Sequence, residues 1–264
     1  MHLRKVVCSL VMLFGLAPSV PSQRASVERD PQGLALALQA IGAVGGVQGI
    51  GHIRDFTATG TITYFWAGQR VSGGAIIRAK GSDQFRLDAH LPGGTRSQIH
   101  DRGRGRMQAP DGNQTDIPPL NLQNSGIITF PYLSLAALVS DPQSSIRLTS
   151  SAVVSGRLTH KIRVQKHLSP EQDRDGFFSD RMVTEYFVDA QSGLIAKISG
   201  RVYSLESLDR EFPRDVEFED YELIHGVMVP RLVREKIAGQ RVWEFHLRTI
   251  IFNNGHRDAD FEIR

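Results

Sequence analysis

The chain has 264 residues, 41% of them hydrophobic, so it can bury a substantial core and is not a disordered protein. Its 31 basic and 28 acidic residues leave a formal net charge of +3, which excludes the general positive field of a nucleic-acid-binding protein. The only cysteine, Cys8, lies near the N-terminus. The rest of the chain therefore has no disulfide, thiol nucleophile or cysteine metal site.

The first two dozen residues have the order of a secretory signal peptide. Arg4 and Lys5 form a short positive start, residues 6–17 are mostly apolar, and residues 18–22 are turn formers and small residues. The apolar run is well short of the ~20 residues that a membrane-spanning helix needs.

We therefore predict a signal peptide over residues 1–22 and a single mature domain over residues 23–264, periplasmic or secreted. The cut is expected after Ser22, with Ala17 and Ser19 as alternative positions. An uncleaved N-terminal anchor is the other interpretation. No later stretch is apolar enough to span a bilayer, so the mature chain is expected to have no transmembrane segment.

A first helix is predicted from Pro31. Asp30 supplies a capping side chain, proline suits the first turn, and Leu34, Leu38 and Ile41 fall on one helical face. Gly42 ends this helix. The glycine-rich link that follows matches neither a dinucleotide-binding nor a P-loop pattern, so we interpret it as a turn or a site of close packing.

From Arg54 the period changes to two, and strands follow at hairpin spacing. Residues 54–66 alternate an apolar face with a threonine-rich face, which is typical of a half-buried strand. Further strands are predicted at 71–79, 84–91, 96–101, 104–109, 145–154, 158–166, 182–189, 194–203, 216–223, 227–236 and 241–252. A second helix is expected at 131–140, and residues 168–180 form an exposed loop.

About eleven antiparallel strands with only two short helices predict a mainly β (α+β) fold. One apolar and one polar face per strand indicate a single large curved sheet, an unclosed β-barrel, with the helices covering its apolar side. Such a sheet can leave an apolar cavity beneath the helices.

Two segments resemble the LolA/LolB-like superfamily of periplasmic lipoprotein carriers. Residues 37–63 (ALQAIGAVGGVQGIGHIRDFTATGTIT) join a helix, glycines and a threonine-rich first strand. Residues 224–264 place a G-V-x-V-P strand before a strand ending in F-N and then D-x-x-F-x-I. The resemblance implies an unclosed barrel of about eleven strands plugged by helices, and an apolar interior that holds acyl chains.

The strand period places a set of large apolar side chains on the inner face, and the second helix adds three more. We take these as candidate ligand-binding residues, although each would also serve as an ordinary core residue. The candidates are Ile62, Tyr64, Trp66, Phe85, Leu87, Leu133, Leu135, Leu138, Trp243, Phe245 and Leu247.

Four arginines gather on one predicted hairpin. Arg96, Arg102, Arg104 and Arg106 either contact phospholipid headgroups or another anionic partner, or form a solvated edge whose charges prevent aggregation. The acidic residues of 211–222 lack the spacing of a calcium loop, and strand alternation indicates a solvated face.

Catalytic and metal-binding motifs are not found. The histidines are scattered, and no nucleophile elbow occurs, so we expect no enzyme activity, metal or cofactor. The sequence thus predicts an exported, non-catalytic protein that binds a lipid or the acyl chain of a lipoprotein. The alternative is a protein-interaction or envelope-stress sensing module of the same fold, with an envelope protein as its partner and no ligand cavity.

Overall fold

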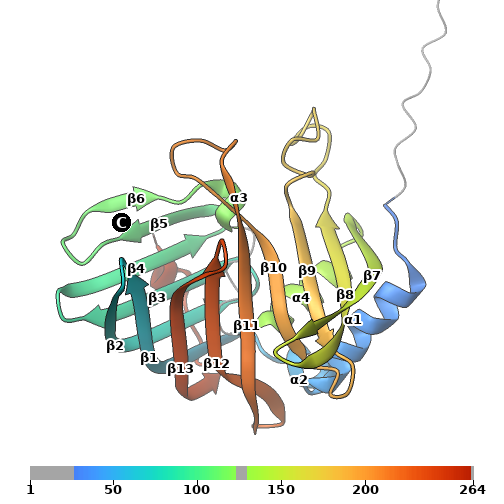
Figure 1. Ribbon diagram of the computed structural model, residues 1–264, viewed down its shortest axis with the longest axis horizontal. Coiled ribbons are helices and arrows are strands. Elements are labelled where there is room, and N and C mark those ends of the chain that lie inside the picture. The colour runs from blue at the N-terminus through green and yellow to red at the C-terminus, as the bar shows by residue number, and fades with distance from the viewer. Residues whose placement is uncertain (1–26, 123–129, 263–264) are drawn as a thin grey trace, which may run out of the picture.

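Residues 27–122 and 130–262 are described by the computed structural model of the chain (Figure 1). The predicted signal peptide, including Cys8, lies outside the described residues. No helix in the described part of the chain is long and apolar enough to cross a membrane.

One antiparallel sheet of thirteen strands dominates the structure. The strands are β1 (Asp55–Trp66), β2 (Gln69–Lys80), β3 (Gln84–Leu91), β4 (Gly94–Asp101), β5 (Arg104–Gln108), β6 (Gln114–Asp116), β7 (Ser144–Val154), β8 (Arg157–Lys166), β9 (Val183–Asp189), β10 (Ile195–Tyr203), β11 (Glu211–Ile224), β12 (Val227–Ile237) and β13 (Gln240–Phe252). Their order in the sheet is β6-β5-β4-β3-β2-β1-β13-β12-β11-β10-β9-β8-β7.

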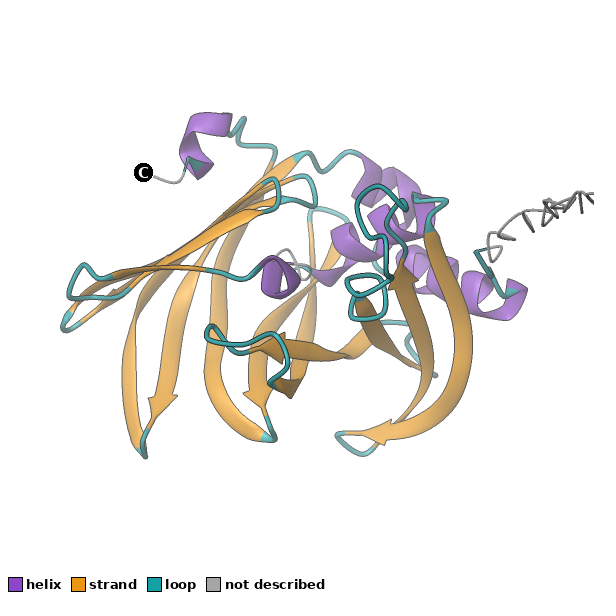
Figure 2. Ribbon diagram, turned by 90° about the horizontal axis from the view of Figure 1, so that it is seen from above, coloured by secondary structure: helices purple, strands orange, loops and turns teal. Residues whose placement is uncertain are grey.

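The sheet curves into an open trough and does not close, because β6 and β7 remain as its two ends (Figure 2). This confirms the predicted unclosed barrel. The concave face is apolar: Phe56, Ala58 and Ile62 of β1 are almost fully buried. The threonines of β1 alternate onto the convex face, where the Thr59 hydroxyl lies 2.7 Å from that of Thr249 on β13.

Four short α-helices belong to the described residues: α1 (Pro31–Ala43), α2 (Gly46–Gly51), α3 (Pro119–Leu122) and α4 (Pro131–Ser140). The Asp30 carboxylate accepts hydrogen bonds from two backbone amides of the first turn of α1, as its position predicted. Helices α1 and α4 contact each other and β7, so they cover one end of the trough (Figure 2).

The structure adds elements that the periodicity did not predict. The glycine-rich link is a short helix, α2, rather than a turn, but close packing is confirmed at Gly45, where an added Cβ would lie 2.7 Å from the Gly226 carbonyl oxygen. Helix α3 and strand β6 are new, and β11 begins at Glu211 instead of residue 216.

Ion pairs between neighbouring strands cover much of the convex face. The acidic residues of β11 belong to this set: Lys236 Nζ lies 2.6 Å from a Glu217 carboxylate oxygen, and Arg234 Nη1 lies 2.5 Å from one of Glu219. These carboxylates are therefore paired across strands rather than simply solvated.

The segment after β13 folds back over the convex face of β3 and β4, ending in a 3-10 helix, η2 (Asp258–Phe261). Asp258 accepts hydrogen bonds from Lys80 and Arg102, both at 2.5 Å, and Phe261 is fully buried. The D-x-x-F spacing thus serves to attach this segment to the sheet. Ile263, the last residue of that motif, lies outside the described residues.

Candidate functional site

Helix α3 lies across the concave side of the sheet and contacts both β5 and β10 (Figure 2). Leu120 and Leu122 are buried. The Asn121 amide donates to the carbonyl of Tyr203 at 2.8 Å and accepts from its N–H at 2.7 Å, which fixes α3 to β10. Pro119 and Leu122 line a cleft on one side of α3, and Asn121 lines a second cleft on the other.

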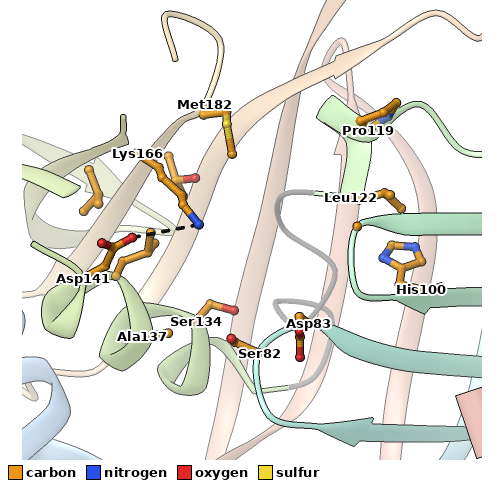
Figure 3. A pocket seen from close by; sticks show the side chains of 14 residues that line it. Ser82, Asp83, His100, Pro119, Leu122, Ser134, Ala137, Asp141, Lys166 and Met182 are labelled. Carbon is orange, nitrogen blue, oxygen red and sulfur yellow. Dashed lines mark ion pairs between the residues drawn. The ribbon is translucent and has the colours of Figure 1, made fainter. Parts of the chain in front are cut away.

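The first of these, the helix-side cleft, has a volume of about 290 Å³ and lies between α3, α4, the turn before β3, and strands β8 and β9 (Figure 3). Its apolar lining consists of Pro119, Leu122, Ala137, Leu138, Val164 and Met182. The polar lining includes Ser134 and the ion pair of Lys166 with Asp141, whose charged atoms are 3.9 Å apart.

His100 is a deeply buried polar residue of the helix-side cleft. Its side chain is 2% exposed, packs edge-on against Phe85, and has an Nδ1 atom without a hydrogen-bond partner. Burial, with a contribution from the nearby Arg214 charge, lowers the pKa of His100 to about 3. The imidazole is therefore neutral at physiological pH and offers one unused hydrogen-bonding atom.

The second cleft, the aromatic cleft, has a volume of about 270 Å³ and lies between α3 and strands β1, β3, β4, β12 and β13. Its apolar lining includes Tyr64, Trp66, Leu87, Met107, Ile117 and Trp243. Three charged side chains also line it: Arg96, Arg214 and Glu235.

An ordered aromatic and cationic group stands at the aromatic cleft. The rings of Tyr64 and Trp66 stack with centroids 5.1 Å apart, and the Arg96 guanidinium lies 5.3 Å and 5.5 Å from these two centroids. Both distances are typical of cation–π contacts. Burial raises the pKa of Tyr64 to about 12, despite the opposing effect of Arg96. The hydroxyl therefore stays protonated at neutral pH.

The predicted site residues divide into two groups. Five line a cleft: Tyr64, Trp66, Leu87 and Trp243 line the aromatic cleft, and Leu138 lines the helix-side cleft. The other six line neither cleft and belong to the core cluster or pack against it: Ile62, Phe85, Leu133, Leu135, Phe245 and Leu247.

Sequence reasoning missed several residues that line the aromatic cleft. Ile117 and Asn121 lie on or beside α3, which was not predicted, and Arg214 lies ahead of the strand predicted from residue 216. Glu235 was assigned to a strand, and the period of two that it shares with Val229 and Val233 is the signal that could have placed it on the inner face.

A larger groove of about 710 Å³ lies on the convex face over β8 to β11. Its acidic side chains are largely matched by basic ones, for example Asp215 with Lys197 at 3.4 Å. Its lining is more polar than apolar, unlike that of the two clefts beside α3. In the described part of the chain, no group of three or more histidine or acidic side chains is arranged to hold a metal ion.

No protein-family model matches the sequence, and no curated protein gives a significant match. The fold, however, occurs in solved structures. A DUF1329 family protein from Desulfovibrio piger superposes with a TM-score of 0.56 at 13% identity, covering 89% of this chain and 98% of its own.

Two other structures agree with it. A LolA superfamily protein from Nitrosomonas europaea has a TM-score of 0.54 at 10% identity and covers 88% of this chain and 97% of its own. A domain from Vibrio parahaemolyticus, described as an outer membrane lipoprotein-sorting protein, has a TM-score of 0.52 at 12% identity and covers 87% and 96%. The resemblance noted in the sequence is therefore confirmed at the level of architecture: this protein has the LolA-like fold.

Proposed function

We propose that the protein binds an apolar ligand, the acyl chain of a lipid or lipoprotein, on the concave face of its sheet, without catalysing a reaction. The observation that carries this proposal is the pair of partly apolar clefts on either side of α3. Trp66 is 39% exposed at the aromatic cleft, so an apolar ligand there would cover apolar surface that the folded chain leaves in contact with water.

Native mass spectrometry with lipid extraction tests this proposal on protein purified gently from its exported form. We expect a co-purifying lipid or acyl chain that is lost in Trp66→Asp or Leu138→Asp. These residues are suitable because neither is fully buried, whereas a charge at the fully buried Phe245 would unfold the core. A clean apo mass that takes up no added fatty acid or lipopeptide would refute the proposal.

The matched control is Leu158→Asp. Leu158 is 53% exposed at the start of β8 and lines neither cleft, so the same change there should leave the bound lipid in place. Loss of lipid in the control as well would show that the effect is a general one on stability.

We also propose that residues 1–22 direct export, which places the ligand outside the cytoplasm. N-terminal sequencing of the protein from an envelope or periplasmic fraction should give a chain that begins after Ser22, Ala17 or Ser19. Recovery of the chain in the cytoplasm with its first residues intact would refute this proposal.

A second candidate function is a protein-interaction module, favoured by the free edge of β7. Among the described residues, the outer edge of β7 is paired only at its start, where Arg29 bridges to Ile146. Residues 149–154 carry no charge, and Val153 is 71% exposed, which leaves an edge able to accept an extended peptide.

A photo-crosslinker at Val153 tests the second candidate in cells that export the protein. A discrete adduct to one envelope protein is expected there, and none from the equally exposed Leu223, which is 65% exposed on β11. Identical patterns at both positions would refute the edge as an interaction site.

A further inference from the structure

The four arginines of the β4–β5 region do not share one environment. Arg102 donates to Asp258, Arg104 lies 3.8 Å from the Asp101 carboxylate, and Arg106 lies 2.9 Å from that of Asp116. These three are ion-paired. Arg96 instead turns to the concave face, where its partners are two aromatic rings and, through Nη2, the sulfur of Met107 at 3.7 Å.

The charged side chains of the aromatic cleft therefore differ in whether they have a partner of opposite charge. Arg214 donates to Glu235 from the neighbouring strand, and the two side chains are 11% and 10% exposed, so they neutralise each other. Among the described residues, no carboxylate lies within ion-pair distance of Arg96. The cleft thus contains one cation without an anionic partner, and the rest of its lining carries no net charge.

Arg96 is also held in position. Its strand pairing with Ala89 places it on the same face as Leu87, and its guanidinium contacts the rings of Tyr64 and Trp66 and the sulfur of Met107. A guanidinium binds a carboxylate through two parallel hydrogen bonds, and a group that is already ordered loses little entropy on binding.

On these grounds, and resting on the proposed binding of an acyl chain, we propose that the ligand is a fatty acid whose chain lies along the aromatic cleft and whose carboxylate binds Arg96. A single unpaired cation matches the one negative charge of a carboxylate. It matches a phosphate monoester less well, because that group carries close to two negative charges at neutral pH. The charged headgroup then gives this ligand a higher affinity than a neutral acyl chain of the same length.

The two tryptophans of the chain, Trp66 and Trp243, both line this cleft, so intrinsic fluorescence reports on it directly. The probes are dodecanoate with bromine on its terminal carbon and the matching brominated dodecanol, both below the concentration at which they aggregate. Bromine quenches tryptophan at close range, and the two probes differ only in the headgroup. Titration of the whole mature protein gives a dissociation constant for each.

We expect the wild-type protein to bind the dodecanoate about 10- to 100-fold more tightly than the dodecanol, which is the range for hydrogen bonds to a charged group. Arg96→Met keeps the aliphatic stem and should abolish this preference, so that the two probes bind with about equal affinity. Arg96→Lys retains the charge without the planar fork and should keep part of the preference.

Arg70→Met is the matched control. Arg70 also lies over an aromatic ring, 5.5 Å from the centroid of Phe65, but its side chain is 70% exposed on the convex face. This variant should retain the full preference for dodecanoate.

The possible failures are distinguishable. Equal affinity for the two probes in the wild-type protein, or a preference that persists in Arg96→Met, overturns the role of Arg96 while acyl-chain binding stands. Absence of quenching by both probes overturns acyl-chain binding at this cleft and with it the fatty-acid assignment.

Discussion

The ion pair beneath the aromatic cleft leads to a quantitative prediction. Arg214 and Glu235 are each about nine-tenths buried, on adjacent inward positions of β11 and β12. Removal of one member of a buried pair costs about 3–5 kcal/mol, because the other charge is left without a partner in a poorly hydrated place. The cleft gives this pair some access to water, so we expect the lower end, about 3 kcal/mol, for Glu235→Leu and for Arg214→Met.

The double variant should behave differently from either single one. With both charges replaced by apolar side chains of similar volume, no charge remains unpaired, and stability should return to within about 1 kcal/mol of the wild type or exceed it. Urea denaturation measures the effect: with a slope of about 3 kcal/mol/M for a chain of this size, each single variant shifts the midpoint by about 1 M. Single variants that cost less than about 1 kcal/mol, or a double variant as unstable as the worse single one, would refute the reasoning.

Three further predictions concern the attachments of α3 and of the segment after β13. Hydrogen bonds from Lys80 and Arg102 lower the pKa of Asp258 to about 2, below its ordinary 3.8, so its stabilising contribution is present above about pH 4 and is lost as the pH falls toward 2. The difference in melting temperature between the wild type and Asp258→Asn should therefore shrink across that window, and a constant difference would contradict it. Phe261→Ala should destabilise by about 3–5 kcal/mol in urea, since a fully buried ring is removed; a loss below about 1 kcal/mol would show that this segment detaches on its own. Asn121→Ala leaves two backbone groups of β10 without partners at a cost of about 1–3 kcal/mol and should speed amide exchange there, with unchanged exchange as the contrary result.

Much of the architecture could be predicted from the sequence because it depends on local signals. Asp30 and Pro31 specify the start of α1, and the alternation along residues 54–66 specifies both faces of β1. Helix α3 could not be predicted in this way. It is a single turn whose position depends on the hydrogen bonds of Asn121 to the distant strand β10, and no periodicity in its own residues records that contact.

The orientation of β4 shows why the candidate site was only partly predictable. Ile99 is the one apolar aliphatic residue of that strand, so its pattern alone suggests that Ile99 faces the core. In the structure Ile99 lies on the convex face beside Ala259 of η2, while Arg96 and His100 face inward. The strand can present polar side chains to the clefts because a segment from the far end of the sequence covers its outer surface.

The pairing of β1 with β13 has a consequence for how the chain reaches its native state. Phe56 of β1 pairs with Phe252 of β13, so the first and last strands in the sequence are neighbours at the centre of the sheet. Every other neighbouring pair in the sheet joins consecutive strands, so this one pairing carries the large loop-closure cost and is expected to form late. The two halves of the sheet cannot be joined before β13 is available, so a chain that emerges from its N-terminal side cannot complete the sheet until its synthesis is nearly finished. Until then, β1 and β12 each present an unpaired strand edge that the finished sheet covers with β13.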